Sequence, residues 1–316
     1  MSTLLVASAG GHLKQLHRLV PRIEGLEQPL VWVTYPTSQS DSLLAGQRVI
    51  HGHPVDSRDY PGVARNAWLA ARLLRRERFS RVLSTGSAIA LAFLPVARLM
   101  GVRCHYIESA ARSIGPSRTG RLLRWLPGAR LYTQYPAWGT PPWCYLGSVF
   151  DAFEVHADQH PAGLPRRVVV CLGTSEQYGF PRLIERMIEI LPASTDVLWQ
   201  TGNTDVAGLG IAARAFVPAA ELDQAIAEAD VVVTHAGTGT ALTALEAGKA
   251  PVLVPRSRAH DENVDDHQSL ISAELARRGL ALDVRPDTLT PADLMTAMRR
   301  RVVQRPDPPP LRLAPD

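Results

Sequence analysis

Short apolar segments alternate with helical segments along the chain, and turns of small residues join several of them. The pattern is clearest at residues 231–255, VVVTHAGTGTALTALEAGKAPVLVP, where three valines lead into a glycine turn, a helical segment and a second apolar run. A strand, a crossover helix and a further strand form a βαβ unit, and repeated units build a parallel sheet with helices on both faces. The alternation therefore predicts an α/β protein.

Two stretches of this alternation flank a segment without a clear period. Residues 151–167 contain two prolines and a glycine and are predicted to be a linker. Residues 1–150 and 168–303 are each predicted to form a doubly wound, Rossmann-like domain, and the domains are expected to face a cleft. The proline-rich tail, residues 304–316, is predicted to be disordered. The expected strands are residues 3–8, 29–35, 81–86, 103–109, 129–135, 167–173, 196–202, 230–237 and 250–255, and the expected helices are residues 12–23, 87–100, 181–191, 221–229, 238–247, 266–278 and 291–303.

Composition argues against several classes of protein. Three cysteines among 316 residues are too few and too scattered for a disulfide framework, and no CxxC pair suggests a metal site. The longest apolar segment with a helical pattern, residues 88–100, is interrupted by Pro95, and it is shorter than the roughly 20 residues that span a bilayer. No basic segment precedes the N-terminal apolar run, so we expect no secretion signal and a cytoplasmic location.

Charge is distributed unevenly between the two halves. The formal net charge is +11 over residues 1–150 and −7 over residues 151–316. Residues 68–81 and 118–130 interleave arginine, leucine and tryptophan at helical spacing. This composition suits peripheral binding to an anionic membrane surface, and it also suits a solvated helix face with a core stripe behind it. We expect no nucleic-acid partner, because no nucleic-acid-binding motif is present and the acidic half offsets the positive field.

Small polar turns follow four of the expected strands, at residues 8–12, 84–87, 172–175 and 235–240. Ligands of parallel α/β sheets collect at the carboxyl ends of strands, and free amide groups at a helix N-terminus bind phosphate. Tight packing of strand against helix also requires glycine, so one such turn says little. The dinucleotide-binding fingerprint is absent because Leu242 occupies its third glycine position, and there is no P-loop motif. An enzyme that binds NAD is therefore not expected.

A carboxylate near the end of the predicted helix suggests a second part of a nucleotide site. Glu246 lies two residues before Gly248, where a carboxylate opposes the helix dipole and needs a partner. That partner is either Lys249 or an arginine, or else the hydroxyl groups of a ribose. The polar loop at residues 256–268 follows a buried strand and ends with side chains suited to sugar hydroxyls, Asp266, His267 and Gln268. A metal site is not expected, because the loop has no clear ligand register.

These segments resemble glycosyltransferase family 28. HAGTGTALTALEAGKAPVLVP, the later DDHQ and VCLGTSEQYGFPRLI are similar to the donor-binding domain of that family, which includes MurG and the catalytic subunit of the eukaryotic dolichol-linked GlcNAc transferase. SAGGHLKQL, STGSAIAL, YIESAARSIGPSRTGRLL and YLGS resemble the partner subunit of the eukaryotic enzyme and its bacterial exopolysaccharide relatives, which implies a role in cell-surface polysaccharide or glycolipid synthesis. The chain thus resembles both subunits fused, without the membrane helix that the eukaryotic pattern carries at its N-terminus.

The resemblance implies a GT-B fold and inverting, metal-independent transfer from a UDP-sugar to a polyprenyl-diphosphate-linked sugar at the inner face of the cell membrane, with no cofactor. GlcNAc is the first choice of sugar, and galactose and glucuronate are alternatives. A UDP-GlcNAc 2-epimerase and a non-catalytic sugar-nucleotide-binding scaffold also remain open. The donor-binding residues that the resemblance implies are Gly173, Thr174, Phe216, His235, Gly237, Thr238, Gly239, Glu246, Asp266, His267 and Gln268.

Inverting transfer needs a base for the acceptor hydroxyl. His12 is the first candidate, because it begins a helix after two glycines, its ordinary pKa is near 6.5, and MurG-like proteins place a histidine in the matching turn. A structural or phosphate-binding histidine is the alternative. Glu108 is the second candidate, and it is equally suited to an ion pair with Arg112. Contacts to the acceptor or its phosphates are expected from Gly10, Gly11, Arg112 and Arg118.

Overall fold

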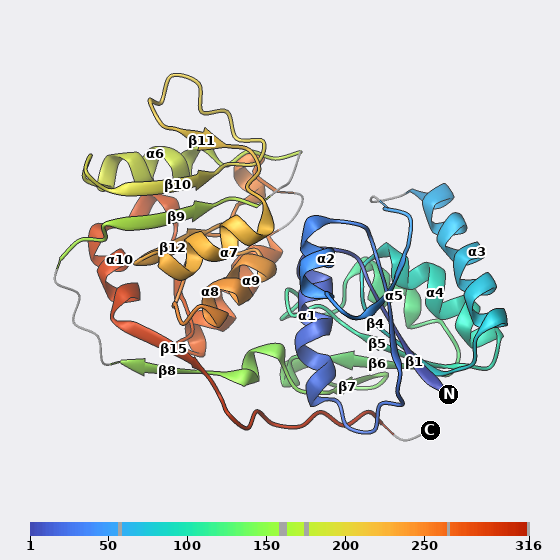
Figure 1. Ribbon diagram of the computed structural model, residues 1–316. Helices are drawn as coiled ribbons and strands as arrows, with labels where there is room; N and C mark the ends of the chain where they lie inside the picture. Colours follow the sequence, from blue (N-terminus) through green and yellow to red (C-terminus); the bar gives the residue numbers. More distant parts are fainter. Residues whose placement is uncertain (56–58, 158–162, 174–176, 264–265, 315–316) are drawn as a thin grey trace. The chain divides into compact units, whose positions relative to one another are not determined.

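The computed structural model describes residues 1–316 except 56–58, 158–162, 174–176, 264–265 and 315–316, and it does not describe the side chain of His267. The chain forms two compact units (Figure 1). Unit 1 comprises Met1–Asp151 and Pro308–Asp316, and unit 2 comprises Ala152–Asp307. Each unit contains its own parallel sheet and its own hydrophobic core, so each is considered by itself.

Unit 1 contains a seven-stranded parallel sheet in the order β3-β2-β1-β4-β5-β6-β7. Its strands are β1 (Ser2–Ala7), β2 (Leu30–Thr34), β3 (Arg48–His51), β4 (Phe79–Gly86), β5 (Arg103–Ile107), β6 (Ala129–Thr133) and β7 (Trp143–Tyr145). Strand order reverses between β1 and β4, so that crevice is the topological switch point, where ligands bind in such sheets. β1 is buried along its whole length, because helices cover both faces of a parallel sheet.

The helices of unit 1 divide between the two faces of its sheet. They are α1 (Gly11–Leu19), α2 (Ser38–Leu43), α3 (Tyr60–Arg76), α4 (Ala88–Leu99) and α5 (Arg118–Leu123). α4 packs against both α3 and α5, and right-handed crossovers place α1 and α2 on the opposite face. α1 is shorter than the predicted helix at residues 12–23, because Pro21 diverts the chain into a short 3₁₀ turn.

Unit 2 repeats the plan with a six-stranded parallel sheet in the order β11-β10-β9-β12-β13-β14. Strand order reverses between β9 and β12, which is its switch point. The strands are β9 (Arg167–Cys171), β10 (Asp196–Gln200), β11 (Ala213–Arg214), β12 (Val231–Thr234), β13 (Val252–Leu253) and β14 (Leu282–Asp283), and the helices are α6 (Pro181–Ile190), α7 (Ala219–Glu228), α8 (Thr238–Glu246), α9 (His267–Arg277) and α10 (Pro291–Met298). The prediction of two doubly wound Rossmann-like halves is confirmed.

Two segments differ from the sequence predictions. The expected linker contains β8 (Phe153–Ala157), which pairs antiparallel with β15 (Arg300–Gln304). The helix predicted at residues 291–303 therefore ends at Met298, and its last part, RRVVQ, forms the strand. The β-branched Val302 and Val303 favour this extended conformation.

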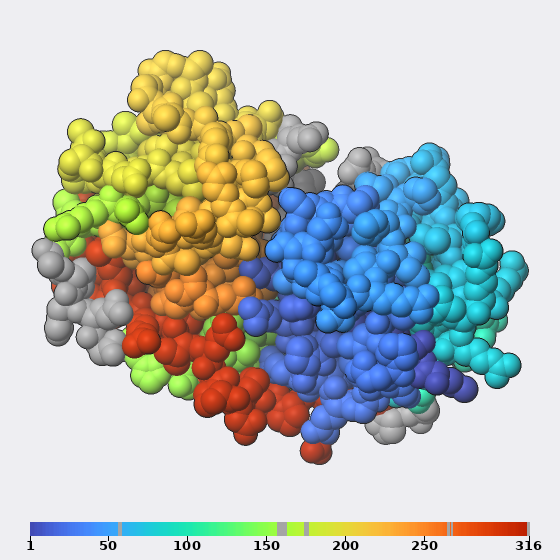
Figure 2. Space-filling model, in the orientation of Figure 1, coloured from blue at the N-terminus to red at the C-terminus, as the bar shows by residue number. Residues whose placement is uncertain are grey.

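The tail is ordered where the structure describes it, contrary to the prediction of disorder. Leu311 is 1% exposed and forms a parallel bridge with Ile23. The buried guanidinium of Arg22 donates to the carbonyls of Pro309 and Ser148. Figure 2 shows the residues at this end of the chain in red. One buried leucine and a buried arginine thus fix a segment whose proline-rich composition had suggested solvent exposure.

Candidate functional site

Two small-residue turns meet at the switch point of unit 1, one after β1 and one after β4. Gly10 forms the N-cap of α1 with φ +83°, a conformation that glycine adopts without strain, and its amide donates to Gln39 Oε1 at 2.7 Å. Gly86 has φ +102°, and a Cβ there would lie 3.1 Å from the His12 ring. Gly86 therefore leaves room for the imidazole of His12, whose helix begins at Gly11.

His12 is held by the neighbouring strand end in one tautomer. Its Nδ1 lies 2.6 Å from the carbonyl oxygen of Thr85, and the Thr85 hydroxyl donates to the His12 carbonyl at 2.8 Å. Because a carbonyl only accepts, Nδ1 carries the proton and Nε2 retains a lone pair. Burial lowers the pKa of His12; the Thr85 carbonyl opposes that change, and the positive charge of Arg112 adds to it. Because its pKa is lowered, the ring is neutral at neutral pH and its Nε2 can act as a base.

Glu108 is a structural carboxylate in this geometry. It is 1% exposed and accepts hydrogen bonds from the Tyr106 hydroxyl, the Ser109 amide, and both the amide and the hydroxyl of Ser117. Burial raises its pKa, and these hydrogen bonds oppose the rise. The carboxylate thus holds together the two ends of the loop at residues 109–117. Both of its oxygens already accept hydrogen bonds, which speaks against Glu108 as the base that deprotonates the acceptor hydroxyl.

Two buried amides that the sequence reasoning did not single out hold the same loop. The Gln15 Oε1 accepts from the Ala110 amide at 2.7 Å, and its Nε2 donates to Ser109 Oγ at 3.1 Å. Gln134 donates to the carbonyl of Glu108 at 3.0 Å and accepts from Val149. Gln15 lies on the buried side of α1, and Gln134 directly follows β6. This network fixes the start of the loop that carries Arg112.

The two predicted arginines lie in different environments. Arg112 is half-buried, and its charge acts on His12. Arg118 is exposed at the first residue of α5. The structure thus brings Arg112 to the candidate base and leaves Arg118 at the surface.

At the switch point of unit 2, two glycines enclose the ring of His235. A Cβ on Gly173 would lie 2.7 Å from His235 Cε1, and one on Gly237 would lie 2.6 Å from it. The ring Nδ1 contacts the carbonyl of Cys171 at 3.2 Å, across from β12 to β9. Packing against the ring therefore requires both glycines, and the imidazole of His235 links the ends of β9 and β12.

The first turn of α8 begins at a glycine and has no side-chain cap. Gly237 is the N-cap and has no side chain to satisfy the amides that follow, which include those of Thr238 and Gly239. The positive end of the helix dipole lies at the same place. Thr174, predicted to share this site with Gly173, lies outside the described residues.

The other predicted donor residues lie after β11 and at the start of α9. Phe216 follows β11 and is 58% exposed. Gln268 is buried, and its Oε1 accepts from the Arg256 amide at 3.0 Å. Asp266 is exposed and accepts from the Arg258 amide at 2.9 Å. His267 begins α9, and its side chain lies outside the described part of the structure.

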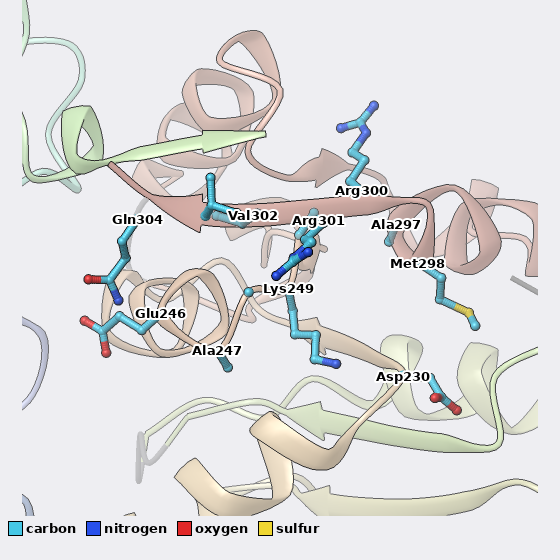
Figure 3. A pocket seen from close by; sticks show the side chains of 13 residues that line it. Asp230, Glu246, Ala247, Lys249, Ala297, Met298, Arg300, Arg301, Val302 and Gln304 are labelled. Atoms are coloured by element: carbon cyan, nitrogen blue, oxygen red, sulfur yellow. The ribbon is translucent and has the colours of Figure 1, made fainter. Parts of the chain in front are cut away.

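Glu246 lies away from the glycine turns. It is in the last turn of α8, which rises about 1.5 Å per residue, so some 12 Å of helix separate it from Thr238. It lines a cavity of about 460 Å³ that also includes Asp230, Lys249 and Gln304, and none of the lining residues belongs to the glycine turns. In Figure 3 Glu246 lies beside Gln304 at one end of this cavity, and Asp230 lies at the other. This placement speaks against Glu246 as the ribose ligand of a nucleotide bound at the turns.

Among the described residues, no group of three or more His, Cys, Asp or Glu side chains is placed to hold a metal ion. No helix in the described part of the chain is long and apolar enough to cross a membrane.

Comparisons with known proteins find similar sequences and similar folds among glycosyltransferases. Residues 167–307 match the glycosyltransferase family 28 C-terminal domain. The chain is 26% identical, over 92% of its length and 86% of the relative's, to the UDP-N-acetylglucosamine–N-acetylmuramyl-(pentapeptide) pyrophosphoryl-undecaprenol N-acetylglucosamine transferase of Ralstonia nicotianae. The crystal structure of Acinetobacter baumannii MurG matches with a TM-score of 0.57 and 20% identity, covering 94% of this chain and 89% of that one. SnogD, a glycosyltransferase from Streptomyces nogalater, matches with a TM-score of 0.57 and 17% identity, covering 94% and 90%. The fold is GT-B, with two Rossmann-like domains.

Proposed function

We propose that the chain is a MurG-like glycosyltransferase of family 28 that transfers GlcNAc from UDP-GlcNAc to a lipid-linked glycan acceptor. The Ralstonia relative is named for transfer of N-acetylglucosamine to a pyrophosphoryl-undecaprenol-linked acceptor. The observation that carries the proposal is the pair of switch points. One presents a neutral imidazole, and the other presents a glycine-capped helix N-terminus.

In the proposed reaction His12 is the general base. Its Nε2 accepts the proton of the acceptor hydroxyl while Nδ1 stays bonded to the Thr85 carbonyl. The hydroxyl oxygen then forms a bond to the anomeric carbon of the donor sugar. The bond from that carbon to the phosphate oxygen breaks on the opposite face, so configuration inverts and UDP leaves with the electron pair. A base held in one tautomer needs no reorganisation during this step.

We propose that the departing diphosphate is stabilised by backbone groups of unit 2. The amides after Gly237 and the dipole of α8 are fixed before the reaction, and preorganised donors stabilise developing charge more effectively than mobile ones. Gly173 completes the site from the end of β9. Transfer is then independent of an added divalent ion.

Unit 1 carries a surface suited to the membrane in which a lipid-linked acceptor resides. Trp68 on α3 and Trp125 after α5 are 65% and 76% exposed, and each lies under an arginine, Arg72 at 5.5 Å and Arg124 at 5.2 Å. Exposed tryptophan with arginine favours the interface of an anionic bilayer. We propose peripheral binding there, at the inner face of the cell membrane. The Trp68→Ala, Trp125→Ala double variant should sediment less with vesicles containing anionic lipid while its UDP binding is unchanged.

The activity is tested with a panel of UDP-sugars offered with a short prenyl-diphosphate-linked sugar, in buffer containing EDTA. We expect mass spectrometry to show an acceptor heavier by one N-acetylhexosamine, together with release of UDP. Transfer of galactose or glucuronate instead would keep the reaction and change the sugar. Formation of UDP-ManNAc without acceptor, or strict dependence on a divalent ion, would overturn the proposed mechanism.

A further inference from the structure

Arg256 is a buried cation at the carboxyl edge of the unit 2 sheet. It follows β13 and is 3% exposed. Its Nη2 donates to the carbonyl of Leu172 at 2.8 Å, and its guanidinium carbon lies 5.9 Å from the centre of the Phe180 ring. Leu172 immediately precedes Gly173, so the guanidinium is attached to the turn after β9.

No carboxylate among the described residues forms an ion pair with this guanidinium. Glu262 is the acidic group whose charge acts on Arg256. However, Glu262 accepts both Nε and Nη2 of Arg182 at 2.8 Å, and its Oε2 also accepts the Ser257 amide. The Nε of Arg256 is buried without a hydrogen-bond partner in the described structure. Burying a charge in this state costs free energy, so a partner is expected when the protein works.

The candidate partner is the anion for which the neighbouring turns are shaped. Gly173 belongs to one of the two turns at the switch point, and the other begins the glycine-capped α8. We propose that Arg256 is a positioning residue of the diphosphate site. It holds the Leu172 carbonyl so that the turn keeps its geometry, and its positive charge stabilises the diphosphate of the donor and of the departing UDP. This inference rests on the proposed function.

The same residue also connects the diphosphate turn to the predicted sugar-binding residue. The Arg256 backbone amide donates to Gln268 Oε1 at 3.0 Å, and Gln268 lies in the first turn of α9. The ends of β9 and β13 and the start of α9 therefore meet at one arginine. Lysine would keep the charge but lose the planar group that stacks on Phe180 and donates to the carbonyl.

The test compares binding of UDP and uridine by calorimetry to the full-length wild-type protein and to Arg256→Gln. We expect Arg256→Gln to weaken UDP binding about 10- to 100-fold, the loss expected for one charge-assisted contact, while uridine binding stays within about twofold. Arg256→Lys should recover part of the UDP affinity. Arg186→Gln is the matched control, because Arg186 also donates to a backbone carbonyl, that of Leu289, and is paired with Glu189.

Equal loss of UDP and uridine affinity in Arg256→Gln, or unchanged UDP affinity in a folded variant, would overturn the assignment. If circular dichroism shows that Arg256→Gln is unfolded, Arg256→Lys decides. In Arg256→Lys, a loss of UDP affinity smaller than tenfold with uridine affinity unchanged supports the proposed role of the positive charge. An equal loss of affinity for UDP and for uridine refutes it. Failure of the wild-type protein to bind UDP would instead overturn the proposed function itself.

Discussion

Gly173 offers a matched test of how closely the turn after β9 is built around His235. Gly173 has φ +77°, and a Cβ there would lie 2.7 Å from Cε1 and 2.9 Å from Nε2 of the ring. Gly208 has nearly the same conformation, φ +78°, and a Cβ there would meet nothing within 4 Å. Gly208→Ala therefore introduces backbone strain alone, whereas Gly173→Ala introduces the same strain and a collision.

The expected difference follows from these two geometries. A left-handed alanine costs about 1–2 kcal/mol at either position. Displacing the imidazole weakens its hydrogen bond to the Cys171 carbonyl, about 0.5–1.5 kcal/mol, and overpacking adds about 1–3 kcal/mol. Gly173→Ala should thus be less stable than Gly208→Ala by about 1.5–4.5 kcal/mol. For a unit of this size that corresponds to a thermal midpoint lower by about 3 °C or more.

The measurement is calorimetric unfolding of both variants, each also combined with His235→Ala. Removing the ring removes the collision, so in the His235→Ala background the two glycine substitutions should cost the same. Equal costs with the histidine in place, or no relief when it is removed, would refute the packing argument. UDP binding gives a second readout, because a displaced turn should bind the diphosphate more weakly.

Three further outcomes are expected. His12→Ala should reduce kcat/KM about 10²- to 10⁴-fold with UDP binding retained. Burial and Arg112 lower the pKa of His12. In the wild-type plot of kcat/KM against pH, the acid limb should therefore lie below pH 6.5, and it should move to higher pH in Arg112→Met. Glu246→Gln should change the donor KM by less than about twofold, and a tenfold rise would restore its ribose role. Leu311→Ala should destabilise unit 1 by about 2–5 kcal/mol, measured by urea unfolding against Leu313→Ala, whose side chain is half-buried.

Local patterns in the sequence predicted the parts of the fold that depend on local physics. β1 and β12 read as apolar runs because both faces of a parallel strand are buried. The turns after these strands contain glycine because Gly10 has a positive φ and Gly237 lies against the ring of His235. Strand order determines which turns meet, and the order placed the four predicted turns in two pairs at the two switch points.

Long-range partners could not be predicted from the same patterns. The strand β15 pairs with β8 across nearly 150 residues of sequence, and the tail is held by Arg22 and Ile23 near the other end of the chain. The amides of Gln15 and Gln134 satisfy backbone groups of a loop distant in sequence. In the sequence, Arg256 begins a loop that is predicted to be polar. The structure shows instead that its side chain is buried and donates to the Leu172 carbonyl.

The two candidate histidines show how one structural device serves two purposes. Each follows a strand at a switch point and contacts, through Nδ1, the carbonyl at the end of the adjacent strand: His12 that of Thr85, and His235 that of Cys171. In unit 2 glycines lie against the ring on two sides, so the imidazole acts as a wedge that shapes the turns. In unit 1 the pKa of the ring is lowered by burial and by Arg112. The contact with a strand-end carbonyl is common to both histidines, and the lowered pKa of His12 favours a neutral ring whose Nε2 can accept a proton.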